Sequence, residues 1–181
     1  MTVMRRLAIL FAASAAVAGA STLASAQGSV SALKGHDSNA PVDVSADRIE
    51  VQDRADRAIF TGNVEVRQGS LELSTARLTV AYANQGGIEI ERLEASGGVV
   101  LRSPSETARS RFAIYDLNRR LVTMIGDVTL TRGPSHVQGG RLVLDLDSGR
   151  AVMDGGAAGA PGVEGGNGRV TGRFTVPGRE D

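Results

Sequence analysis

Side chains that could do chemistry are sparse in this chain of 181 residues, which contains two histidines and no cysteine. His36 lies in a polar segment and His136 in an expected turn, and neither has a second histidine or a carboxylate at the spacing of metal ligands. Asp145 and Asp147 share the outward face of one expected strand, where carboxylates are usually solvated rather than bound to a cation. The sequence therefore predicts no metal site and no cofactor.

Motifs of nucleophilic and phosphate chemistry are also missing. No Gly-x-Ser-x-Gly turn presents a serine, and the glycine-rich run from Gly155 to Gly168 has no nucleotide-binding pattern and precedes no expected helix. Arginines recur at the starts of expected strands, where an outward charge keeps a sheet soluble and discourages edge pairing. A contact with an anionic headgroup is the alternative. These arginines are Arg48, Arg77, Arg111 and Arg141. From the sequence we therefore expect a protein that is not an enzyme.

The arginines belong to a repeat of about thirty residues. Each copy begins with a glycine and a valine-rich stretch, as in Gly62-Asn63-Val64, Gly97-Gly98-Val99 and Gly126-Asp127-Val128, and a weaker copy starts at Gly155. The glycines are nearly evenly spaced, and an arginine follows each of them about half a repeat later. A fixed period in this range is typical of stacked units that share one continuous core.

Within the repeats, apolar and polar residues alternate with the period of a β-strand. Ala58, Phe60, Val64 and Val66 fall on one face, for example, while polar residues occupy much of the other. Turn-forming residues interrupt this alternation about every eight to twelve residues, as in β-sandwiches and barrels. The pattern predicts an all-β protein of short antiparallel strands with one buried face. Glycines within such strands mark bulges or bends.

Residues 1–26 are typical of a secretory signal. Arg5 and Arg6 precede an apolar run from Leu7 to Ala20, which is shorter than the roughly 18 residues of a membrane span. Ala24-Ser25-Ala26 fits the cleavage pattern, so we expect the mature chain to begin at Gln27. Removing the two arginines from 20 basic residues leaves 18 against 20 acidic ones, a net charge of −2. This charge argues against nucleic acid as a partner.

The mature chain divides into three parts. Residues 27–40 are polar and aperiodic, and we expect a flexible leader there. Residues 41–156 carry the alternation and should form one β domain, whereas residues 157–181 are a glycine-rich tail with room for one last short strand. The apolar face of the domain consists mainly of aliphatic side chains. Such a face is either an ordinary filled core or a groove whose soft walls suit acyl chains, and composition does not separate the two.

The first repeat resembles a known family. The segments 41–51 and 57–69 contain the pattern A-D-x-hydrophobic, then A-x-F-x-G-N-V, then Q-G, and the segment 71–80 continues it with alternating apolar residues. Found together behind a signal peptide, these motifs resemble the LptA/OstA-like family of periplasmic lipopolysaccharide-transport proteins. The resemblance covers residues 41–156, and the glycine-rich tail departs from it.

This resemblance implies an open, twisted β-jelly roll, in which the antiparallel strand repeats noted above surround a hydrophobic interior. It implies that the interior holds the lipid A acyl chains of lipopolysaccharide while the sugars face solvent. It also implies head-to-tail stacking of copies into a periplasmic bridge. An LptC-like inner-membrane protein would stand at one end, and the N-terminal domain of an LptD-like outer-membrane protein at the other. No catalytic residue comes with the family.

The residues expected to bind lipid are the apolar positions that match the strand pattern of the family. Alternation assigns them to the inner face, and a slip of one residue would reverse a strand. They are Ile49, Val51, Phe60, Val64, Val66, Leu73, Leu78, Val80, Val99, Leu101, Phe112, Ile114, Met124, Val128, Leu130, Leu142 and Leu144.

Three other functions stay open on the sequence alone. A self-associating β-solenoid with a structural role would show the same repeats around a filled core. An LptC-like subunit would keep an N-terminal membrane anchor, which the cleavage site after Ala26 argues against. An enzyme acting on a glycolipid or a cell-wall sugar would need paired carboxylates facing one cleft, and the alternation does not assemble such a pair.

Overall fold

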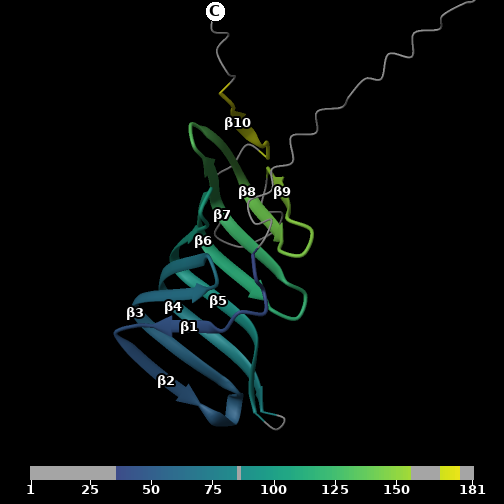
Figure 1. The fold of residues 1–181 in the computed structure, drawn as a ribbon. Helices are drawn as coiled ribbons and strands as arrows, with labels where there is room; N and C mark the ends of the chain where they lie inside the picture. The colour runs from purple at the N-terminus through teal and green to yellow at the C-terminus, as the bar shows by residue number, and fades with distance from the viewer. Residues whose placement is uncertain (1–35, 85–86, 156–167, 176–181) are drawn as a thin grey trace, which may run out of the picture.

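Antiparallel strands make up most of the computed structural model, which describes residues 36–84, 87–155 and 168–175 (Figure 1). In chain order they are β1 (Val42–Ser45), β2 (Arg48–Gln52), β3 (Arg57–Gln68), β4 (Leu71–Asn84), β5 (Ile88–Arg102), β6 (Thr107–Asp116), β7 (Leu121–Arg132), β8 (Ser135–Asp145), β9 (Arg150–Asp154) and β10 (Thr171–Arg173), with a short 3-10 helix, η1 (Asp53–Ala55), after β2. The predicted signal sequence, the first part of the predicted leader and most of the predicted tail lie outside the described residues.

The strands form one sheet in the order β1-β3-β4-β5-β6-β7-β8-β10. From β3 to β8, each strand pairs with the next one along the chain. At one end of the sheet β1 and β2 pair with successive parts of β3, and at the other end β9 and β10 pair with successive parts of β8. Within the described residues these two edges do not pair with each other. The predicted all-β class with an open sheet is therefore confirmed.

The repeated glycines lie at β-bulges. The strand register shifts at Gly62-Asn63 in β3, at Gly97-Gly98 in β5 and at Gly126-Asp127 in β7. All six of these residues have positive φ angles, which favour glycine and are tolerated best elsewhere by asparagine and aspartate. Cross-strand pairing brings the three bulges into one row, which we call the fold line.

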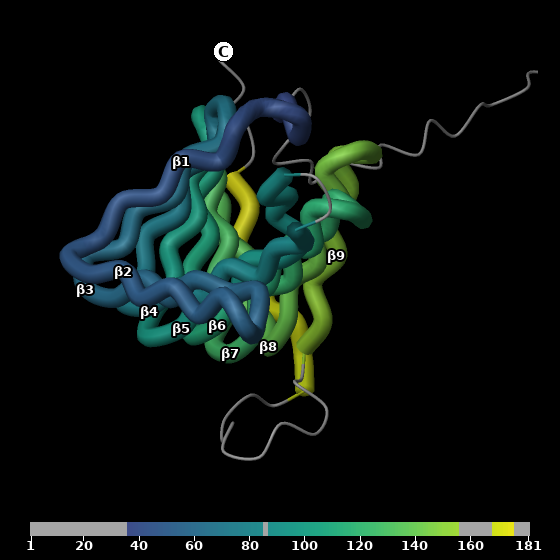
Figure 2. The backbone as a smooth tube through the Cα atoms, turned by 90° about the horizontal axis from the view of Figure 1, so that it is seen from below, coloured from purple at the N-terminus to yellow at the C-terminus, as the bar shows by residue number. Residues whose placement is uncertain are grey.

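The sheet bends along the fold line into two halves. In β4 the buried positions are odd-numbered as far as Thr75 and even-numbered from Leu78 onward, and in β6 they change from even to odd between Ser110 and Ala113. We call the halves the β1 half-sheet, which ends in β1 and β10, and the β2 half-sheet, which ends in β2 and β9. Figure 2 shows the strands turning back at this bend, so that the two halves face each other in a β-jelly roll.

Close packing explains why glycine recurs at the fold line. A β-carbon on Gly97 would lie 2.8 Å from Cβ of Ala76 on the neighbouring strand, and one on Gly126 would lie 3.2 Å from Cβ of Arg111. The guanidinium of Arg111 also pairs with Asp127 at 2.5 Å. The spacing of glycine and arginine therefore has a structural role here, because each arginine-bearing strand packs beside the bulge of its neighbour.

The weaker fourth copy of the repeat lies at the C-terminal edge. Gly155 directly follows β9, and a β-carbon there would collide with the backbone of Gly168 and Arg169. Gly155 therefore lies directly beside Gly168 and Arg169, the residues that lead into β10. β9 and β10 together form one edge strand that is interrupted at the fold line.

Candidate functional site

Most of the predicted interior residues are buried between the half-sheets. Phe60 is partly buried and packs against this core. The buried residues of the predicted set are Val64, Val66, Leu73, Leu78, Val80, Val99, Leu101, Met124, Val128, Leu130, Leu142 and Leu144. The structure thus brings them together as one aliphatic core cluster.

The facing predicted for Phe112 and Ile114 is wrong. Both point to the outer face of the sheet and are 46% and 37% exposed, respectively. The inner positions of this part of β6 belong to Ala113 and Tyr115, which are buried. The reason is the phase change of β6 at the fold line, since alternation counted from Ser110 without that change assigns every later residue to the wrong face.

Ile49 and Val51 face the interior but are not enclosed by it. Their cross-strand partners are Phe60 and Ala58, and directly opposed residues of an antiparallel pair share one face of the sheet. Phe60 and Ala58 pack against the core, whereas Ile49 and Val51 remain 55% and 56% exposed. The apolar inner face therefore continues to an uncovered end of the sheet at β2.

The space inside the jelly roll is narrow. A cavity beneath β1 lies among Val42, Leu73 and Leu93 and has about 30 Å³ of space open to water. A second cavity, beyond Leu71 and Leu101, has about 10 Å³ of such space. A single water molecule needs about 10–15 Å³. In this conformation, therefore, the side chains of the two halves nearly fill the interior.

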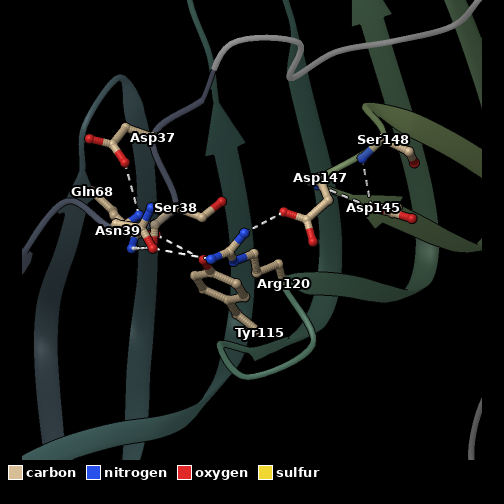
Figure 3. A network of polar contacts seen from close by, with 9 residues as sticks. All are labelled: Asp37, Ser38, Asn39, Gln68, Tyr115, Arg120, Asp145, Asp147 and Ser148. Atoms are coloured by element: carbon tan, nitrogen blue, oxygen red, sulfur yellow. Dashed lines mark hydrogen bonds and ion pairs between the residues drawn. The ribbon is translucent and has the colours of Figure 1, made fainter.

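Polar residues tie the half-sheets together at the mouth of the jelly roll, on the side away from the fold line (Figure 3). Tyr115 of the β2 half-sheet donates its hydroxyl to Oε1 of Gln68 in the β1 half-sheet at 2.9 Å, and both residues are buried. Burial raises the pKa of Tyr115. Nε2 of Gln68 donates to the carbonyl oxygens of Ser38 at 3.0 Å and Ala40 at 3.1 Å. Gln68 thus joins the opposite half-sheet and the segment that enters β1.

Arg120 holds the same segment from the β2 half-sheet. Its guanidinium donates to the side chain of Asn39 at 3.1 Å and to Asp147 at 2.7 Å. We call Gln68, Tyr115, Arg120 and residues 36–40 the clasp. The sequence does not predict it, because it assigns residues 27–40 to a flexible leader. One signal in the sequence does point to it, because Gln68 follows Val64 and Val66 at intervals of two residues and so lies on the same buried face of β3.

A buried carboxylate is the other unpredicted feature. The side chain of Glu106 is 2% exposed, and its Oε1 lies 2.6 Å from Nε of Arg132 in an ion pair. Burial raises the pKa of Glu106, and the positive charge of Arg132 opposes that rise. Alternation offers a signal here, since Glu106 has the same phase as the buried Ala108.

The histidines and Asp145, which were the candidate side chains for chemistry, make contacts that stabilise the fold. His36 belongs to the clasp, and its Nε2 lies 3.3 Å from Oε1 of Gln68. His136 lies in β8 rather than in the expected turn and is paired with Thr131 of β7. Oδ1 of Asp145 accepts the backbone N–H of Ser148 at 3.0 Å, which closes a turn and lowers the pKa of Asp145. In the part of the chain that the structure describes, no three metal-ligating side chains gather, and no helix is long and apolar enough to span a membrane.

Comparisons with known proteins agree with this architecture. The sequence model of the family described as LptA/(LptD N-terminal domain) LPS transport protein matches residues 43–150. An uncharacterised protein of Rhizobium meliloti (strain 1021) is 34% identical over 163 residues, which covers 81% of this chain and 88% of that protein. The crystal structure of LptH, the LptA-homologous periplasmic component of the lipopolysaccharide transport device of Pseudomonas aeruginosa, is similar with a TM-score of 0.67.

LptH shares 19% of its residues with this chain, and the similarity covers 78% of this chain and 99% of LptH. At that identity the likeness concerns the fold. The family match is the stronger finding, because it extends from β1 to the start of β9 and so includes both half-sheets and the whole fold line. On this match the chain belongs to the LptA/(LptD N-terminal domain) family of lipopolysaccharide transport proteins.

Proposed function

We propose that this protein carries lipopolysaccharide through the periplasm and shields its acyl chains between the two half-sheets. The observation that carries the proposal is the aliphatic inner face that continues to an uncovered end, where Ile49 and Val51 are more than half exposed. Among the described residues, Tyr115 is the one aromatic side chain buried in that core. Flexible aliphatic walls of this kind adapt to an acyl chain.

The free energy of the acyl chains explains why a carrier is needed. Burying one CH₂ group is worth ~0.8 kcal/mol, so a chain of ~12 such groups gains about 10 kcal/mol when it leaves water. A lipid with several chains would meet a prohibitive barrier in an aqueous compartment. A protein interior that continues from one copy to the next would remove that barrier without any chemical reaction.

The interior must widen before it can admit a chain, because only about 30 Å³ is open in its main cavity. The half-sheets are continuous along the fold line and are tied at the mouth by the clasp. We infer that they separate at the clasp, with the fold line as the hinge. The narrow cavity also favours a second candidate, a self-associating structural protein whose core stays filled.

We also propose that copies stack head to tail. The edge formed by β1 and β2 and the edge formed by β9 and β10 each have one side without a partner strand in the described structure. Such an edge can accept a strand of another chain, and joining unlike edges produces an assembly that propagates. An LptC-like inner-membrane protein and the N-terminal domain of an LptD-like outer-membrane protein would occupy its two ends.

Export to the periplasm is part of the proposal. The secretory signal expected in residues 1–26 supports it, as does the description of LptH as a periplasmic component. Cleavage after Ala26 would release a soluble carrier into that compartment.

Photo-crosslinking to lipopolysaccharide tests the proposal. A photoreactive amino acid is placed at Val51 or Phe60 on the inner face, and at Ile114 or Glu65 on the outer face. Ile114 is the critical control, because it is apolar and 37% exposed but faces outward. We expect crosslinks at Val51 and Phe60 and none at the two outer positions. Equal labelling of Ile114 would mean nonspecific adsorption, and a folded protein without crosslinks would favour the filled structural core.

A further inference from the structure

Glu106 places a carboxylate inside an otherwise aliphatic part of the interior. It lines the smaller cavity together with Leu71, Leu101 and Leu130. Among the described residues it is the one buried side chain that carries a formal charge. Burying a carboxylate is costly unless its oxygens have partners, so its surroundings indicate what a ligand in this interior would have to provide.

The two oxygens of this carboxylate differ. Oε1 lies 2.6 Å from Nε of Arg132, in an ion pair whose arginine is 46% exposed at its side chain. Both oxygens are buried and neither accepts a well-aligned hydrogen bond from the described residues, so that Oε1 has the ion pair whereas no such close cation contact is seen at Oε2. An ionised, desolvated oxygen without a donor is a strong acceptor. A hydrogen-bond donor that reached Oε2 would remove an existing penalty as well as add a contact.

The neighbouring charge indicates which donor fits best. Arg132 already balances the negative charge of Glu106, so an ammonium group on the ligand would add an uncompensated positive charge in a buried place. A neutral hydroxyl avoids that cost. Hydroxyl groups can also be carried on an acyl chain, so that the donor arrives with the apolar part of the ligand.

The position of Glu106 indicates where on the chain this hydroxyl would be. Glu106 directly precedes β6 and lies at the end of the β1 half-sheet that is farthest from the fold line. The clasp residue Gln68 occupies the corresponding end of β3. When an acyl chain enters at this mouth with the polar head of the lipid in solvent, the carbons nearest the head therefore lie beside Glu106.

We propose that Glu106 is a specificity determinant whose Oε2 accepts a hydrogen bond from a hydroxyl group on an acyl chain, close to the polar head of the lipid. This inference rests on the proposed function, because it requires acyl chains to enter the interior. It adds a chemical preference among chains that the aliphatic walls alone would not distinguish.

Binding of matched lipids tests the preference. The probes are N-tetradecanoylglucosamine, its 3-hydroxytetradecanoyl counterpart and a 12-hydroxytetradecanoyl isomer, measured by isothermal titration with the mature wild-type chain. Glu106→Met removes the acceptor while keeping the length of the side chain, and Glu65→Met is the control on the outer face. Urea unfolding establishes that both variants are folded. A charge-assisted hydrogen bond predicts about tenfold tighter binding of the 3-hydroxy probe.

Glu106→Met should abolish that preference, so that the plain and 3-hydroxy probes bind with about equal affinity. This variant should bind the plain probe at least as tightly as the wild type does, whereas Glu65→Met should preserve the preference. Equal affinity of the plain and 3-hydroxy probes for the wild type would overturn the inference while leaving the proposed function intact. Equal weakening of all three probes by Glu106→Met would overturn it too, because the sugar would then be the donor. If no probe bound the wild type, the inference and the proposed function would both fall.

Discussion

Gly97 and Gly98 allow a direct test of the fold line, because they share a backbone conformation but differ in their surroundings. Their φ angles are +87° and +88°. A β-carbon on Gly97 would lie 2.8 Å from Cβ of Ala76, whereas one on Gly98 would have nothing within 4 Å. Replacing each glycine by alanine therefore imposes the same kind of backbone strain, and only Gly97→Ala adds a steric collision.

The magnitudes follow from these two contributions. An L-residue in left-handed backbone costs about 1–2 kcal/mol, and the reduced freedom of the unfolded chain offsets about 0.4–1 kcal/mol of it. We therefore expect Gly98→Ala to destabilise the protein by about 1 kcal/mol. Carbon atoms pack at about 3.5–4.0 Å, and a β-carbon cannot rotate away from Ala76, so Gly97→Ala must push β4 and β5 apart. Overpacking of this kind adds about 1–3 kcal/mol.

Urea denaturation followed by circular dichroism measures the difference. With a slope of about 1–3 kcal/mol per molar urea for a domain of this size, a gap of about 2 kcal/mol should separate the two unfolding midpoints by about 1 M. Equal midpoints for Gly97→Ala and Gly98→Ala would refute the argument that close approach of β4 requires glycine at the fold line.

Three further perturbations address the clasp, the edge and the buried acid. Gln68→Leu should destabilise the protein by about 1–3 kcal/mol, because Tyr115 loses its acceptor, and it should speed lipid uptake in stopped-flow measurements; slower uptake would contradict a clasp that opens. Ile49→Asp should leave the unfolding midpoint nearly unchanged, because the side chain is already exposed, but should reduce the oligomer mass in sedimentation experiments if β2 forms the joint. Burial raises the pKa of Glu106, which means that folding favours the protonated form of this side chain. The stability that the protonated Glu106 contributes is therefore full below its unfolded pKa of about 4.3 and is lost as the pH rises through the folded pKa. The melting temperature of Glu106→Gln relative to wild type should therefore increase between about pH 4 and pH 7, and a constant difference would show that Glu106 does not titrate in this way.

The bends of the sheet were only partly predictable from sequence. In β3, β5 and β7 a glycine marks each bulge, because two consecutive residues there need positive φ angles. β6 changes phase without such a marker, since Ser110, Arg111 and Phe112 read as continuous alternation. Alternation therefore assigns Phe112 and Ile114 to the wrong face. A glycine in the sequence thus indicates a bulge whose backbone needs positive φ angles. The sequence gives no such indication for β6, which changes its buried phase because it pairs with bulged neighbours.

The clasp and Glu106 escape prediction for a different reason. The hydrogen bond between Tyr115 and Gln68 joins residues 47 positions apart, and it depends on the two half-sheets meeting at the mouth. Local periodicity carries no information about that meeting. What the sequence does contain is polar residues at positions whose phase is buried, among them Gln68 and Glu106. A polar side chain in a core phase is thus the signal to examine when strand alternation is otherwise regular.

The distinction between a carrier and a filled structural core depends on what opposes separation of the half-sheets. On the side of the fold line the chain is continuous, so opening strains the bulges rather than breaking strand pairs. At the mouth the clasp contributes a few hydrogen bonds, each worth about 1 kcal/mol net. The larger cost is the loss of apolar contact between the halves, and an acyl chain entering the gap would restore contact of the same chemical kind. A nearly filled interior is therefore compatible with lipid carriage, provided that the clasp yields before the fold line does, and the uptake rate of Gln68→Leu measures that order directly.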